Sequence, residues 1–123
     1  MQGIKLIILF GSQATGKAGK RSDTDIAILA DHSLSYGERA KISEEIAQEL
    51  GANEDDVDTV DLWDASPLLQ YEVAKKGKLL HGEERDFVRF KILAWKRYLD
   101  TAKFRRLRRK ALDKWFLEPR VKS

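Results

Sequence analysis

A glycine-serine turn followed by two closely spaced aspartates constrains this chain more than any other feature of its sequence. The apolar run of residues 6–10 ends at Gly11-Ser12, ten residues follow, and the chain then reads Asp23-Thr24-Asp25. A continuous apolar run bounded by glycine is typical of a strand buried on both faces. The pattern therefore predicts a buried strand, a tight turn with room for a phosphate group, and two carboxylates where a second strand begins.

The spacing of the two aspartates places them together. Alternate side chains of a strand share a face, so Asp23 and Asp25 should point one way and Thr24 the other. Carboxylate oxygens suit Mg²⁺, and an adjacent pair can bridge two ions beside a nucleoside triphosphate. An Asx-type turn at the entry of a strand would also explain an isolated Ser-Asp-x-Asp, so the pair needs support from the rest of the chain.

A P-loop is the competing interpretation of the same glycines. Gly11 and Gly16-Lys17 have the P-loop spacing, but the next residue is Ala18, where that motif requires serine or threonine. Alanine has no hydroxyl to ligate magnesium, and the residues after Lys17 lack the helical apolar pattern that a P-loop must open. We therefore favour the glycine-serine turn and the aspartate pair as one unit.

Local signals beyond the second strand predict further strands and helices, that is, an α/β (α+β) fold. Capping residues and apolar spacing predict helices over residues 35–50 and 66–77, and β-rich runs predict strands at residues 57–62 and 79–81. Residues 84–116 contain no glycine or proline and repeat apolar residues at helical spacing. This segment is predicted to form one long helix, or two joined near Thr101.

Composition indicates one small, cytoplasmic domain with a basic extension. The chain has 123 residues and no cysteine, which excludes a disulfide framework or a thiolate metal site, and it has no apolar run long enough for a membrane span. Residues 1–82 hold 9 Lys/Arg and 14 Asp/Glu, whereas residues 83–123 hold 14 and 6. We predict a domain over 1–82 and a basic helical arm over 83–123. Charge alone favours a solvated helix over a surface for nucleic acid or an acidic partner.

The order of motifs resembles the DNA polymerase β-like nucleotidyltransferase superfamily, and in particular its minimal nucleotidyltransferases. Their hallmark is Gly-Ser, about ten residues and Asp-x-Asp, as in Gly11-Ser12 and Asp23-Thr24-Asp25. The run Arg21 to Leu29 is similar to the family's second strand, and Val57-Asp58-Thr59-Val60-Asp61-Leu62 to the strand that carries a third carboxylate. Residues 65–80 are similar to the segment that closes the domain, so the resemblance covers about residues 4–82.

The resemblance implies the nucleotidyltransferase fold, a small mixed β-sheet with helices. It also implies a site for two Mg²⁺ ions and a nucleoside triphosphate, most simply ATP. Its catalytic and metal-binding carboxylates would be Asp23, Asp25 and Asp58. Asp61 is the alternative third carboxylate, and a regular strand would point it away from Asp58. Phosphate contacts are expected from Gly11, Ser12, Lys17 and Arg21, with Lys20 as a further helper.

The resemblance also implies a role. Free-standing minimal nucleotidyltransferases are often antitoxins that transfer AMP to a tyrosine of a HEPN-family RNase toxin, so we expect a protein adenylyltransferase with a HEPN partner. The basic helix would then serve the partner or self-association. Two alternatives stay open: a catalytically silent module that neutralises a partner by contact, and a nucleic-acid-binding protein that uses residues 105–110.

Overall fold

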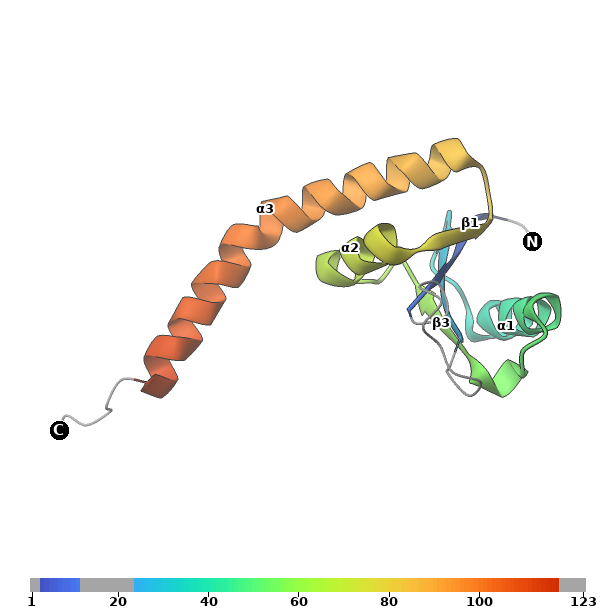
Figure 1. Cartoon of the computed structure of the whole chain (residues 1–123), viewed down its shortest axis with the longest axis horizontal. Coiled ribbons are helices and arrows are strands. Elements are labelled where there is room, and N and C mark those ends of the chain that lie inside the picture. The colour runs from blue at the N-terminus through green and yellow to red at the C-terminus, as the bar shows by residue number, and fades with distance from the viewer. Residues whose placement is uncertain (1–2, 12–23, 118–123) are drawn as a thin grey trace.

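A four-stranded sheet with helices on both faces forms the body of the protein (Figure 1). The computed structural model describes residues 3–11 and 24–117. The strands are β1 (Ile4–Phe10), β2 (Thr24–Ala30), β3 (Val57–Asp61) and β4 (Lys78–His81), and they lie in the order β3-β2-β1-β4. β1 is antiparallel to both β2 and β4, whereas β2 and β3 are parallel. The mixed α/β fold predicted from the sequence is confirmed.

The central strand β1 is buried on both faces, as its unbroken apolar sequence predicts. Leu6, Ile7 and Ile8 are fully buried. Leu6 and Ile8 point to the face covered by α2 and α3, and Ile7 points to the face covered by α1. This alternation divides the core into two apolar clusters, one on each side of the sheet.

Helix α1 (Tyr36–Leu50) connects the two parallel strands. It begins one residue after the predicted start, because Ser35 is its capping residue, and it ends at the predicted residue. The Ser35 hydroxyl accepts from the Glu38 backbone N–H, and the Glu38 carboxylate accepts from the Ser35 backbone N–H, which completes a capping box. Gly51 ends the helix with a positive φ of 68°. Ile42, Ile46 and Ala47 bury the inner face of α1 against the sheet.

Helix α2 (Pro67–Lys76) leads into the edge strand β4. The Ser66 hydroxyl accepts from the Leu69 backbone N–H, and Pro67 occupies the first turn, where its missing N–H removes no intrahelical bond. Val73 is fully buried and belongs to the same apolar cluster as Leu6 and Ile8. Both the helix and the additional edge strand were predicted by the sequence.

Helix α3 (Glu84–Leu117) is a single helix of 34 residues. Its first turns belong to the core, because Phe87, Phe90 and Ala94 are buried with Leu6 and Ile8. Figure 1 shows the rest of the helix curving away from the sheet. The interpretation as one continuous helix is confirmed for the described residues, whereas the division of the chain at residue 82 stays a prediction.

The middle of α3 contacts α2 through aromatic and polar side chains. The rings of Tyr71 and Tyr98 stack with their centroids 4.0 Å apart, and the Arg105 guanidinium lies 3.8 Å from the Tyr98 ring centroid. The Thr101 hydroxyl donates to the Arg97 carbonyl, a contact that bends helices slightly. None of the helices built by the described residues combines the length and apolar character that a membrane crossing requires.

Candidate active site

Two carboxylates and a glycine turn meet at one end of the sheet. Gly11 directly follows β1, Asp25 is the second residue of β2, and Asp58 is the second residue of β3. Phe10 is paired with Asp25, and Asp25 is paired with Asp58. Three neighbouring strands therefore bring together residues that are up to 47 positions apart in the sequence.

The two carboxylates share the face of the sheet that α2 and α3 cover. Ala27, two residues after Asp25, belongs to the core cluster on that face, and side-by-side residues of paired strands point the same way. Asp25 is half-buried and Asp58 is exposed. Thr24 is 4% exposed, which agrees with its predicted orientation toward the opposite face.

The turn at Gly11 is tight enough to require glycine. Its φ is 79°, a left-handed conformation that side chains disfavour. A Cβ atom added there would lie 2.5 Å from Asp25 Oδ2, well inside van der Waals contact. The backbone of the turn is thus packed directly against one of the candidate metal ligands.

Asp61 occupies a different environment from Asp58. It is 8% exposed, and its two carboxylate oxygens accept hydrogen bonds from the Leu34 N–H (2.8 Å) and the Trp63 N–H (2.9 Å). These bonds join the end of β3 to the segment before α1. Asp61 is therefore engaged in holding the backbone, whereas Asp58 presents its carboxylate beside Asp25.

The remaining predicted site residues lie outside the described part of the chain. They are Ser12, Lys17, Lys20, Arg21 and Asp23. Within residues 3–11 and 24–117, no three His, Asp or Glu side chains gather closely enough to hold a metal ion. The described residues thus supply Asp25 and Asp58, and the complete ligand set stays a prediction.

Comparison with known proteins identifies the family. Residues 1–86 match the family described as polymerase beta nucleotidyltransferase. The chain belongs to this nucleotidyltransferase family. The matched range includes the glycine turn, both strands with carboxylates, α2, β4 and the start of α3.

Two curated relatives are described as the protein adenylyltransferase MntA. The relative from Shewanella oneidensis is 40% identical over 83 residues, which cover 68% of this chain and 58% of the relative. The relative from Aphanizomenon flos-aquae is 36% identical over 90 residues, which cover 68% of this chain and 60% of the relative. The chain thus spans somewhat less than two thirds of the relatives it matches.

Solved structures extend the similarity over most of the chain. One is a toxin–antitoxin crystal structure with AMP-PNP, with a TM-score of 0.74 and 32% identity over 91% of this chain and 89% of the other. Another is a tri-AMPylated Shewanella oneidensis HEPN toxin in complex with an MNT antitoxin, with a TM-score of 0.67 and 30% identity over 91% of this chain and 86% of the other. The nucleotidyltransferase fold is shared with these structures.

A cluster of ionisable side chains links the far end of β2 to α1. His32 Nδ1 lies 2.6 Å from Asp31 Oδ1, and His32 Nε2 lies 2.8 Å from Glu38 Oε2. Hydrogen bonding to Asp31, and then to Glu38, raises the pKa of His32 above its ordinary value. Bonds from the Ser35 backbone and from His32 lower the pKa of Glu38. Because one of these partners is the capping-box glutamate, the cluster ties β2 to the start of α1.

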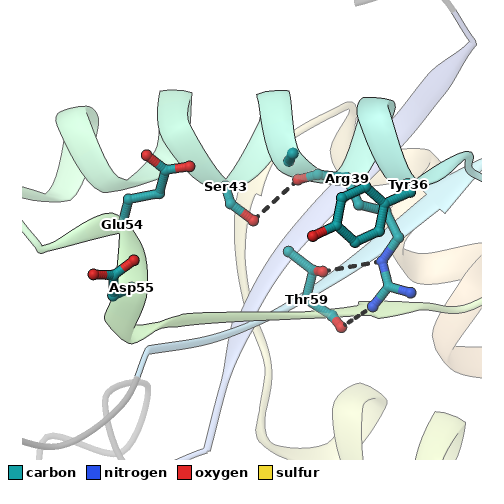
Figure 2. Close-up of a pocket in the computed structure, with 7 residues that line it drawn as sticks. Tyr36, Arg39, Ser43, Glu54, Asp55 and Thr59 are labelled. Atoms are coloured by element: carbon teal, nitrogen blue, oxygen red, sulfur yellow. Dashed lines mark hydrogen bonds between the residues drawn. The ribbon is translucent and has the colours of Figure 1, made fainter.

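A cavity of about 340 Å³ lies between α1 and β3, on the opposite face of the sheet from Asp58. Figure 2 shows Arg39 reaching from α1 to Thr59, with Glu54 and Asp55 at the other end of the hollow. Arg39 donates from Nε to the Thr59 hydroxyl and from Nη2 to the Thr59 carbonyl. This arginine satisfies an outward-facing carbonyl of an edge strand, which explains it as a structural residue.

Proposed function

We propose that this protein is a Mg²⁺-dependent adenylyltransferase that transfers AMP from ATP to a hydroxyl group of a partner protein. The observation that carries the proposal is the pairing of Asp25 with Asp58 beside the Gly11 turn, inside the segment that matches the nucleotidyltransferase family. The names of the relatives, protein adenylyltransferase MntA, support AMP transfer to protein. A cytoplasmic location belongs to the proposal, because ATP would be supplied there.

In the proposed reaction, an oxygen of the acceptor attacks the α-phosphorus of ATP. A bond forms between the acceptor oxygen and the α-phosphorus, the bond to the bridging oxygen of the β-phosphate breaks, and pyrophosphate leaves. The proton of the acceptor hydroxyl must go to a base. We assign this role to Asp58, because its carboxylate is exposed beside Asp25 and has no hydrogen-bond partner within the described residues.

Asp23, Asp25 and Asp58 are the residues that we propose to hold magnesium. The donor set fits the ion, because Mg²⁺ prefers carboxylate oxygens and Asp25 and Asp58 stand side by side on one face of the sheet. When bound, two magnesium ions would neutralise the charge on the triphosphate and on the attacking oxygen. Gly11 would allow the triphosphate to approach the backbone, and Ser12, Lys17 and Arg21 would contact its phosphates.

The proposed acceptor is a tyrosine of a HEPN-family toxin, and the proposed role is that of its antitoxin. Support comes from a similar structure in which an MNT antitoxin is bound to a tri-AMPylated HEPN toxin, and from another described as the toxin-antitoxin MntA-HepT. An AMP-PNP complex among the similar structures supports ATP as the nucleotide.

Transfer of label from α-phosphate-labelled ATP to the purified HEPN partner tests the function. We expect labelling with the wild-type protein and Mg²⁺, and at least a hundredfold slower labelling with Asp25→Asn or Asp58→Asn, because each removes a proposed ligand. Asp56→Asn is the matched control, an exposed aspartate two residues from Asp58 that should label normally. Equal rates for Asp58→Asn and Asp56→Asn would exclude the assigned mechanism.

Two alternatives predict different results. A module that neutralises its partner by contact alone would still protect cells when both Asp25 and Asp58 are changed to asparagine. The observation that favours a nucleic-acid-binding protein is the exposure of four basic side chains near the end of α3, namely Arg106, Arg108, Arg109 and Lys110. That alternative requires retardation of DNA or RNA in a gel and an affinity that falls steeply with salt.

A further inference from the structure

The catalytic proposal does not use a cavity of about 410 Å³ that lies between the first half of α3 and the sheet. Its floor is apolar and consists of Leu29, Leu62, Phe90 and Ala94. Lys5 on its rim lies near the end of β1 where Ile4 pairs with Ala30, whereas Phe10 pairs with Asp25 at the opposite end. The cavity is therefore separate from the candidate active site.

Two large apolar side chains that line this cavity are exposed to solvent. Trp63 is 55% exposed and Leu93 is 49% exposed, and both line it. A mouth with such exposed walls suits a side chain presented by another protein better than a small ligand, because small-ligand sites enclose most of the ligand surface. Tryptophan and arginine are also the residue types that contribute most to protein interfaces.

The rim is positively charged. Lys5, Arg89 and Arg97 line the cavity together with a single carboxylate, Asp86. Neither Lys5 nor Arg89 has an ion-pair partner within residues 3–11 and 24–117. An apolar floor with unpaired cations around it is complementary to an apolar side chain that lies next to a carboxylate.

One of these cations is held in place by a buried amide. Gln70 is 7% exposed, and its Nε2 donates to the Leu62 carbonyl at 3.0 Å. Its Oε1 accepts from Arg97 Nη1 at 3.1 Å. The remaining N–H groups of the guanidinium stay available for an incoming carboxylate, and less side-chain entropy is lost on binding because Arg97 is already fixed.

We propose that this cavity, the Trp63 cavity, is a docking site for a segment of a partner protein that carries an aromatic or aliphatic residue beside aspartate or glutamate. The apolar side chain enters between Trp63 and Leu93, and the carboxylate pairs with Arg89 and Arg97. The site goes beyond the proposed function, because it binds protein without taking part in nucleotide transfer.

Selection of short random peptides displayed on phage against the full chain tests the proposal. We expect the enriched peptides to combine an apolar residue with a neighbouring acidic residue. Their synthetic, fluorescently labelled forms should bind the wild-type protein in anisotropy titrations, and that affinity should fall at least tenfold in Leu93→Asp and in Arg89→Glu.

Matched controls are available on the same helix. Ile92 is 59% exposed and Lys96 is exposed, and neither lines the cavity, so Ile92→Asp and Lys96→Glu should bind the peptides within about twofold of wild type. Binding of ATP with Mg²⁺, followed by calorimetry, should be unchanged in all four variants, which separates this site from the catalytic one.

Several results would overturn the docking proposal. They are a failure to enrich any peptide, enriched peptides without acidic residues, and equal losses of affinity in the cavity and control variants. A wild-type dimer in sedimentation equilibrium that Leu93→Asp converts to a monomer would also overturn it, because the occupant would then be a second copy of this chain.

Discussion

At the scale of single residues, Gly11 is the position where backbone conformation and site geometry depend on each other most directly. Gly11→Ala would place Cβ against Asp25 Oδ2 and force a left-handed conformation that costs about 1–2 kcal/mol. We expect a lower free energy of unfolding in urea and at least tenfold weaker binding of ATP with Mg²⁺. Gly37→Ala is the control, because no atom lies within 4 Å of its added Cβ and the helix favours alanine. Unchanged nucleotide binding in Gly11→Ala would mean that this turn takes no part in binding the nucleotide.

The His32 cluster predicts a pH dependence of stability. Its partners raise the pKa of His32 in the folded protein, so the cluster stabilises fully below the ordinary histidine value of about 6.5 and loses this effect as pH rises through the folded-state value. The melting temperature of wild type should therefore exceed that of His32→Gln most near pH 6, and the difference should shrink toward pH 9. Asp31→Asn, which removes the first partner, should show the same trend. A difference that grows with pH would contradict this account.

The spacing of residues along β3 does not decide whether Asp58 or Asp61 is the third carboxylate of the site. Alternation along the strand indicates that the two side chains point to opposite faces, but it does not indicate which of them accepts hydrogen bonds from the backbone. The answer depends on the Leu34 N–H, 27 positions away, which donates to Asp61 in the folded chain. The role of each carboxylate is thus set by tertiary structure rather than by the local pattern.

At the scale of elements, local signals were sufficient wherever the stabilising contact is itself local. The capping residues Ser35, Gly51 and Ser66 lie within four residues of the groups that they bond, and they located both short helices. The sheet order, the parallel pairing of β2 with β3 and the Trp63 cavity join distant segments. No local pattern specifies such contacts, so local signals predicted only the elements, and the mixed sheet was expected from the resemblance to the nucleotidyltransferase family.

Helix α3 should be integral to the domain in its first half and dispensable to its stability in its second. Phe90 is 7% exposed in the core, so Phe90→Ala should lower the free energy of unfolding by about 3–5 kcal/mol. Leu107 is 51% exposed, so Leu107→Ala should change it by less than about 0.5 kcal/mol. Urea titrations of both variants measure this, and equal losses would mean that the two halves fold as one unit. A small loss in Phe90→Ala would instead support the predicted boundary at residue 82.

At the scale of the whole molecule, the two ends of the sheet have different proposed tasks. The end that carries Gly11, Asp25 and Asp58 is proposed to hold the nucleotide, and the opposite end, beside Trp63 and α3, is proposed to hold an acidic and apolar segment of another protein. The acidic residues 1–82 and the basic residues 83–123 are consistent with this separation. The candidate metal site needs negative charge, and the rim of the Trp63 cavity needs positive charge. The two sites lie at opposite ends of the sheet.

The central claim is that the protein transfers AMP to a partner protein and uses the carboxylates of Asp25 and Asp58 to do so. Its most direct test is the intact mass of the HEPN partner after co-expression with wild type, with Asp25→Asn and with the control Asp56→Asn. We predict that the partner gains the mass of one or more AMP groups with wild type and with Asp56→Asn, and none with Asp25→Asn. A partner that remains unmodified with wild type, or that is modified equally with Asp25→Asn, would contradict the claim.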